Sequence, residues 1–138
     1  MAQPIPDLWP EIEQSQVVPP VAILREQAAL LGKKTNHLLE GRVITRPTGD
    51  GRFTHLFCIV APALDDYTYK LFEIVHGANQ YPVEAAGLER PGDLPRIGPA
   101  IVHLASEQEL LDHIRKILNS DGTKRVIGSL LAQIKATS

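Results

Sequence analysis

Five histidines are the residues of this sequence best suited to metal binding or acid–base chemistry. Zn²⁺ sites commonly combine histidines at positions i and i+4 of a helix, or pairs of cysteines in a Cys-x-x-Cys spacing. Neither pattern occurs among His37, His55, His76, His103 and His113 and the single cysteine. We expect His55 and His76 to lie at opposite ends of adjacent strands, where strand pairing would keep them apart. The sequence therefore predicts no metal ion and no cofactor.

Cys58 is the only cysteine and hence the one candidate for a thiol nucleophile. A reactive thiolate needs an accessible, electropositive setting that lowers the pKa of the thiol. Cys58 instead lies between Phe57 and Ile59 in an apolar run, where a thiol usually packs as a small hydrophobic group. We therefore interpret Cys58 as structural. No combination of residues defines a catalytic site, and we expect a protein that is not an enzyme.

Glu73 is the acidic residue whose neighbours suggest a ligand pocket. It shares an expected strand face with Tyr67 and Tyr69, and we interpret that face as exposed sheet surface. The alternative is a pocket between the sheet and the helices, in which Tyr69, Glu73 and His55 would contact a small ligand.

Basic residues occur in pairs near the ends of the predicted helices. Such pairs usually complement the negative C-terminal end of the helix dipole, although together they could form a patch for nucleic acid. Acidic residues lie among them, and the net charge of the whole chain is −2, so the composition disfavours a nucleic-acid partner. The pairs are Lys33–Lys34, Arg115–Lys116 and Lys124–Arg125.

The first 20 residues differ in composition from the rest of the chain. They contain five of the 11 prolines, three acidic residues, no basic residue and the only tryptophan. Proline restricts the backbone and removes a hydrogen-bond donor, so we interpret residues 1–19 as an extended acidic arm. Leu8 and Trp9 are its exception, because large apolar side chains are stabilised by burial. Folding back onto the same domain is the simpler interpretation, and docking onto a partner chain is the alternative.

Residues 20–138 are predicted to form one domain, since about 120 residues can bury a core of their own. Apolar spacing of three and four residues predicts a helix over Pro20–Lys34. Alternating or β-branched runs separated by Gly, Pro and Asp predict strands, and a Ser-x-x-Glu capping box at Ser106 predicts the next helix. A last amphipathic helix follows Gly122. The strands are expected over 38–46, 52–61, 67–76, 81–85 and 100–104, with a long loop over 87–99.

This order of elements predicts an α+β fold. An N-terminal helix precedes an antiparallel meander of four to five strands, and two C-terminal amphipathic helices pack on one face of the sheet. The apolar run Leu56–Ala61 predicts a central strand that is covered on both faces, by the fold or by a partner. No apolar run reaches the length of a membrane span, and the N-terminus does not resemble a signal peptide, so we expect a cytoplasmic protein.

Three functions remain open at this stage. The first is a non-enzymatic protein-interaction module, such as a small bacterial-type adaptor, a chaperone-like protein or an inhibitor or immunity-like protein. It would bind another protein, or a second copy of itself, through the arm and an aromatic sheet face. The second is a small-ligand-binding or enzymatic domain, and the third is a nucleic-acid accessory protein. The proposed partner-binding residues are Leu8, Trp9, Phe53, Phe57, Tyr67 and Tyr69.

Overall fold

The computed structural model describes residues 4–87 and 101–138 and contains one antiparallel sheet of five strands. The strands follow the order β1 (Glu40–Pro47), β2 (Phe53–Ala61), β3 (Tyr67–His76), β4 (Val83–Gly87) and β5 (Ile101–Leu104). The helices are α1 (Pro20–Lys34), α2 (Glu107–Leu118) and α3 (Asp121–Thr137), and the short 3-10 turn η1 covers Pro62–Leu64. This order confirms the predicted α+β class. The loop predicted over 87–99 lies, apart from Gly87, outside the described residues.

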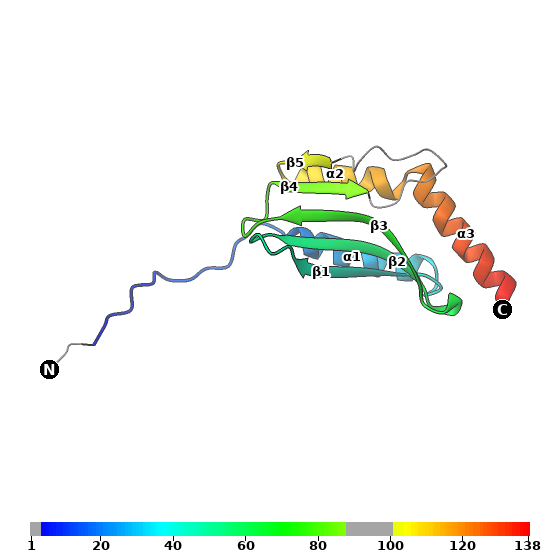
Figure 1. The fold of residues 1–138 in the computed structure, drawn as a ribbon, viewed down its shortest axis with the longest axis horizontal. Coiled ribbons are helices and arrows are strands. Elements are labelled where there is room, and N and C mark those ends of the chain that lie inside the picture. Colours follow the sequence, from blue (N-terminus) through cyan, green and yellow to red (C-terminus); the bar gives the residue numbers. More distant parts are fainter. Residues whose placement is uncertain (1–3, 88–100) are drawn as a thin grey trace.

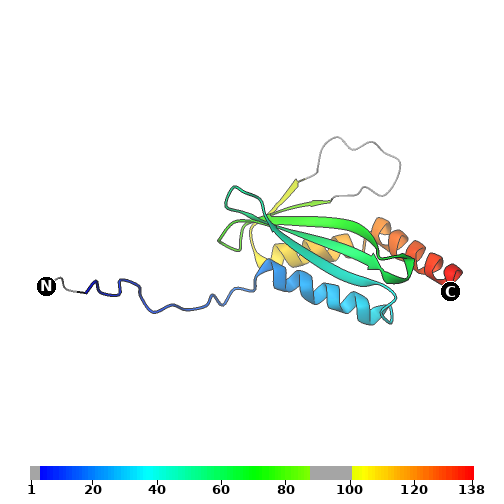
Figure 2. The same ribbon diagram turned by 60° about the horizontal axis from the view of Figure 1, so that its bottom comes forward.

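The three helices lie on one face of the sheet. Figure 1 looks onto the opposite face, with α1 behind β1 and β2 and α2 behind β4 and β5. In Figure 2 the helices form a layer below the sheet, and α3 continues past the end where β2 turns into β3. The N-terminal arm leaves the molecule at the other end of the sheet (Figures 1 and 2).

α1 has the bounds that its apolar spacing predicts. Pro20 begins it, because the first helical position does not use its N–H group. Leu24 and Ala28 are buried on the side that faces the sheet. Lys33 and Lys34 form the last turn, where positive charge complements the helix dipole.

β2 pairs with β3 along its whole length, with one irregularity. Phe57 pairs with Phe72, but Cys58 pairs with Lys70, so Leu71 is an extra residue on β3. Such a β-bulge interrupts the alternation of side chains between the two faces of the sheet. Residues of β3 on the two sides of the bulge therefore cannot be assigned to faces by counting in twos.

The core lies between the sheet and the helix layer. Its centre is the pair Phe57 and Phe72, whose stacked rings are 5.2 Å apart between centroids. Ile74 is fully buried in the same core cluster, which also contains side chains of the C-terminal helices. α2 and α3 contribute the buried side chains of Leu110, Ile114, Leu130 and Ile134, and Ile117, Val126, Ile127 and Leu131 pack against them partly buried.

β4 differs from its prediction in position and in environment. The sequence predicts a strand over 81–85 at a sheet edge, because proline cannot donate to a ladder. In the structure Pro82 precedes the strand, which begins at Val83 and lies between β3 and β5. The edge assignment was wrong because Pro82 is not part of the ladder.

Gly41 is the position where the contact between α1 and β1 depends on the absence of a side chain. A Cβ atom on Gly41 would lie 2.6 Å from the Cβ of Ala28 and 3.0 Å from its carbonyl oxygen. We therefore expect Gly41→Ala to lower the free energy of unfolding by about 1–3 kcal/mol, the usual cost of overpacking a close contact. Gly128→Ala is the matched control, because a Cβ atom at Gly128 meets no heavy atom within 4 Å. Urea unfolding should show this control unchanged or up to about 1 kcal/mol more stable, since alanine favours helix over glycine. Equal effects of the two substitutions would contradict the proposed close packing.

Candidate functional site

His55 is the centre of a chain of side-chain hydrogen bonds near the end of the sheet where the arm leaves. Thr45 Oγ1 lies 2.9 Å from His55 Nδ1, and His55 Nε2 lies 2.8 Å from His76 Nε2. His76 Nδ1 lies 2.7 Å from the carbonyl oxygen of Gly77. His55 itself is only 4% exposed. Thr45, His55 and His76 are termed the histidine chain below.

The contact between His55 and His76 corrects the expectation that strand pairing separates them. In an antiparallel hairpin the beginning of one strand meets the end of the next. His55 lies at the beginning of β2 and His76 at the end of β3, and His55 pairs with Ile74, two residues before His76. The two rings therefore lie on the same face, with 4.9 Å between their centroids. The predicted hairpin placed both histidines at the same end of the sheet, but only the β-bulge at Leu71 puts them on the same face.

The partners of the histidine chain define where its protons lie. The carbonyl of Gly77 can only accept, so we assign the Nδ1 proton to His76. In the neutral pair, His76 Nε2 then accepts from His55 Nε2–H, and His55 Nδ1 accepts from the Thr45 hydroxyl. Burial lowers the pKa of His55 to about 4, with smaller contributions from the positive charges of His76 and Arg25. The folded protein therefore favours the uncharged form of His55.

The histidine chain is arranged for structural hydrogen bonding. Each ring nitrogen of the pair has a hydrogen-bond partner within the protein. The positive charge of Arg25 acts on His55 and opposes the binding of a cation there. Over residues 4–87 and 101–138, no group of three or more His, Cys, Asp or Glu side chains could hold a metal ion.

The alternative ligand pocket of Tyr69, Glu73 and His55 is not assembled by the fold. Tyr69 pairs with Ile59, on the face that the helices cover, whereas Glu73 pairs with Leu56 on the opposite face. The β-bulge between them causes this separation, so the expectation that they share a face was wrong. His55 lies on the face of Tyr69, but four residues along β2 from Ile59.

The four aromatic residues proposed as a partner-binding face lie on the side of the sheet that carries the helices. Phe57 is 2% exposed and packs in the core, so the expectation of an open aromatic face was wrong for this residue. Phe53 and Tyr67, near the two ends of the sheet, are exposed. Phe53 also contacts the ring of His76, at 5.9 Å between centroids. Tyr69 is half-buried.

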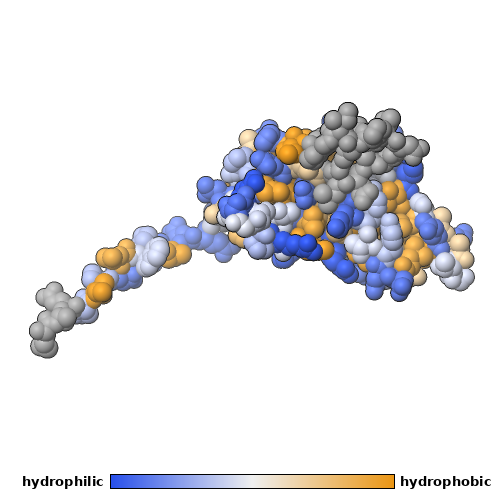
Figure 3. All heavy atoms as spheres, viewed as in Figure 1, coloured by the Kyte–Doolittle hydropathy of each residue, from blue (hydrophilic) through white to orange (hydrophobic). Residues whose placement is uncertain are grey.

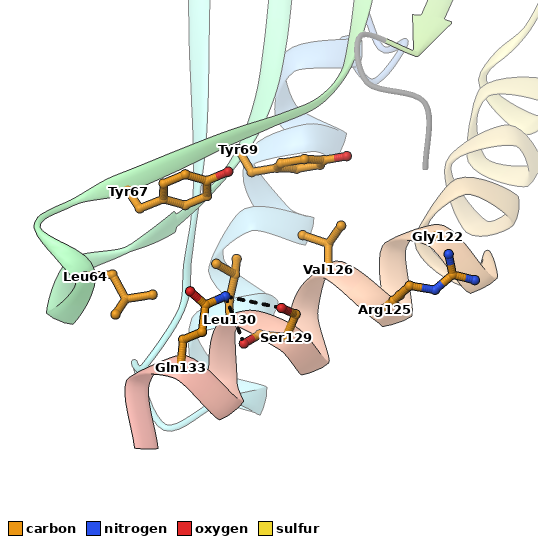
Figure 4. A pocket seen from close by; sticks show the side chains of 9 residues that line it. All are labelled: Leu64, Tyr67, Tyr69, Gly122, Arg125, Val126, Ser129, Leu130 and Gln133. Atoms are coloured by element: carbon orange, nitrogen blue, oxygen red, sulfur yellow. Dashed lines mark hydrogen bonds between the residues drawn. The ribbon is translucent and has the colours of Figure 1, made fainter. Parts of the chain in front are cut away.

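Tyr67 and Tyr69 form one wall of a groove against α3, termed the tyrosine groove (Figure 4). The other wall is α3, where Gln133 donates hydrogen bonds to the carbonyl and hydroxyl oxygens of Ser129. The volume of the groove is about 590 Å³. The remaining lining residues are Leu64, Gly122, Arg125, Val126 and Leu130.

A second groove lies between α1 and the junction of α2 with α3, and is termed the helix groove. Its volume is about 400 Å³. The buried side chains of Phe57, Ile59 and Leu71 contribute to its lining from the sheet. Polar side chains enter its lining from the helices, among them that of Lys34. The other lining residues are Gln27, Leu30, Leu31, Leu118, Asn119, Thr123 and Ile127.

The arm does not fold back onto the described part of the domain. Leu8 is 82% exposed and Trp9 is 78% exposed, which contradicts the simpler interpretation of the sequence. Figure 3 shows apolar side chains spaced along the arm, away from the body of the molecule. The arm is held at its base, where the Tyr81 hydroxyl donates to the carbonyl oxygen of Val18 over 3.2 Å.

Cys58 is fully buried, on the sheet face without a described helix over it. Its neighbours Leu56 and Val60 are also buried, as expected for a central strand covered on both faces. Burial raises the pKa of the Cys58 thiol, although the charges of Lys70 and Arg42 act in the opposite direction. This environment agrees with a structural thiol.

Comparisons with known proteins add no identity to this description. No family model, no curated protein and no solved structure matches the chain. In the part of the chain that the structure describes, no helix has the length and hydropathy needed to cross a membrane.

The buried histidine predicts a pH dependence of stability. The pKa of His55 falls from 6.5 to about 4 on folding, so the unfolded chain binds a proton that the folded state excludes. Stability should therefore be complete above pH 6.5 and decrease as the pH falls toward 4, by at most about 1.4 kcal/mol per pH unit from this group. Urea unfolding across this range should show a smaller decrease in His55→Gln than in the unsubstituted protein. The exposed His103→Gln is the control, and an unchanged slope in His55→Gln would contradict the prediction.

The burial of Cys58 predicts slow chemistry at its thiol. A thiol reagent should label the native protein far more slowly than the protein in denaturant, because the sulfur is inaccessible and its pKa is raised. Timed labelling followed by mass spectrometry measures both rates. Rapid labelling of the native protein would show that Cys58 is accessible and would reopen a catalytic role.

Proposed function

We propose that this protein is a non-enzymatic interaction module whose N-terminal arm binds a protein surface. The observation that carries this proposal is the exposure of the arm's large apolar side chains. Ile5, Leu8, Trp9 and Ile12 are between 76% and 88% exposed. Exposed apolar groups of this size are stabilised when a partner covers them, and short recognition segments commonly present such anchors.

The composition of the arm favours a partner with a basic, partly apolar surface. Asp7, Glu11 and Glu13 alternate with the apolar anchors, and residues 4–18 contain no Lys or Arg. Aromatic and aliphatic anchors supply most of the binding energy at protein interfaces, and complementary charge increases the association rate. An adaptor, a chaperone-like protein and an inhibitor would all use such a segment.

A small apolar ligand is the second candidate, and the helix groove is the observation that favours it. Its volume of about 400 Å³ lies in the range of ligand pockets, and Phe57, Ile59 and Leu71 give it an apolar sheet side. This groove lies between the sheet and the helices, where the sequence interpretation placed a pocket. It differs from that interpretation in its residues, because Tyr69, Glu73 and His55 do not line it.

Trp9→Ala combined with Leu8→Ala should weaken binding to the partner without destabilising the fold. Both side chains are exposed, so the free energy of unfolding should change by less than about 0.5 kcal/mol. Quantitative cross-linking of the intact 138-residue chain in extracts of its source cells should show fewer linked proteins for this variant. Leu38→Ala is the control, because Leu38 is an exposed leucine outside the arm.

Two results would contradict the proposal. A loss of more than about 1 kcal/mol of stability in the arm variant would place the arm in the fold, since exposed side chains contribute little. An unchanged pattern of cross-links would show that the arm does not bind a protein.

A further inference from the structure

The helix groove has a charge opposite to that of the arm. Lys34 lines it, and Lys33 is next to it at the end of α1. Lys124 follows the lining residue Thr123, and Lys116 lies in the last turn of α2, whose final residue lines the groove. These four lysines are exposed. On the helices, the acidic residues within two positions of a lining residue are Glu26 and Asp121, which leaves a surplus of positive charge.

The arm is complementary to this groove in chemistry, and it is long enough to reach the groove of a neighbouring molecule. It combines apolar anchors at Leu8, Trp9 and Ile12 with the carboxylates of Glu11 and Glu13. The groove combines an apolar sheet side with lysines around it. Residues 4–18 span about 50 Å when extended, which is long enough to cross onto a neighbouring molecule.

The base of the arm directs it away from the groove of its own chain. Val18 and Pro19 each precede a proline, and a residue in that position is held in an extended conformation. Pro19 accordingly has φ −67° and ψ 147°. The hydrogen bond from Tyr81 to Val18 holds the base at the start of α1, whereas the lining residues of α1 run from Gln27 to Lys34 in its second half. In Figure 2 the arm extends away from the helix layer.

We propose that the arm of one chain binds in the helix groove of a second copy, so that two chains associate by exchanging their arms. Trp9 and its apolar neighbours enter the apolar part of the groove, and Glu11 and Glu13 lie against the lysines around it. A twofold arrangement makes this contact twice with the same residues, as closed dimers do. This inference rests on the proposed function of the arm and names its partner.

Sedimentation of the intact 138-residue chain over a range of concentrations tests the proposal. We expect a monomer–dimer equilibrium, and at least a tenfold higher dissociation constant for Trp9→Ala and for Lys34→Glu combined with Lys124→Glu. The combined Lys34→Glu and Lys124→Glu substitution is termed the lysine variant. Adding Glu11→Lys and Glu13→Lys to it should restore association, because the arm is then basic and the groove acidic. Lys135→Glu is the control, since it removes an exposed lysine at the far end of α3. High salt should weaken the dimer, because exposed charges are screened.

The two single-sided variants provide a second measurement. Trp9→Ala keeps an intact groove and the lysine variant keeps an intact arm, so a mixed dimer retains one unaltered contact and a mixture should form more dimer than the more strongly weakened variant alone. Circular dichroism of each variant confirms that the domain is folded. Trp9 is the only tryptophan, so its fluorescence reports directly on burial of the arm.

Three results would overturn the proposal. A monomer at all concentrations with buried Trp9 fluorescence would place the arm in its own chain. A dimer unaffected by both variants would use another surface. A monomer with exposed Trp9 would exclude a second copy as the partner. In that case the cross-linking of the arm variant decides whether the proposed function itself stands, with another protein as the partner.

Discussion

β2 and β3 pair in antiparallel orientation with one shift of register at a β-bulge, and the positions of the aromatic and histidine side chains depend on this pairing. The register places Phe57 opposite Phe72, where the stacked rings form the centre of the core. The same pairing brings His55 and His76 into hydrogen-bonding contact two pairs further along. The β-bulge then turns the rest of β3, so that Tyr69 faces the helices while Glu73 faces the other side. A shift of β3 by one residue would move all of its side chains to the opposite face of the sheet.

The histidine chain shows how a polar cluster can be placed beside an apolar core. A buried charge is costly, and the folded state avoids this cost by keeping His55 neutral. Every ring nitrogen of the pair has a partner, so the desolvated groups are compensated by hydrogen bonds. The chain of bonds links β1, β2 and β3, because Thr45, His55 and His76 each come from a different strand. It therefore helps to hold the end of the sheet from which the arm leaves.

The helix layer covers the sheet incompletely, and this leaves the two grooves. α2 ends at Leu118, and only Asn119 separates it from Ser120, the cap of α3. The Ser120 side chain accepts a hydrogen bond from Thr123 N–H. α2 and α3 therefore meet at a short junction, and the helix groove opens between that junction and α1. The tyrosine groove opens farther along, where α3 runs beside η1 and the beginning of β3. The arm supplies apolar side chains that nothing in the described part of its own chain covers, and the helix groove offers an apolar surface of complementary charge.

Local features of the sequence were sufficient to predict the helices, the strands and the extended N-terminal arm. The proline at the start of α1, the Ser106 capping box and the apolar spacing of α2 and α3 act over a few residues, and the structure has helices at these positions. The prolines, acids and apolar anchors of the arm are likewise properties of a short segment. Only the tertiary structure decided which side chains contact one another across the fold. Neither the bulge at Leu71, the contact of His55 with His76 nor the helix groove follows from local spacing, because each depends on how residues distant in sequence pack. The burial of Phe57 and the exposure of Trp9 follow from the same packing, since apolar character gives the tendency of a side chain to be buried but not the surface that covers it.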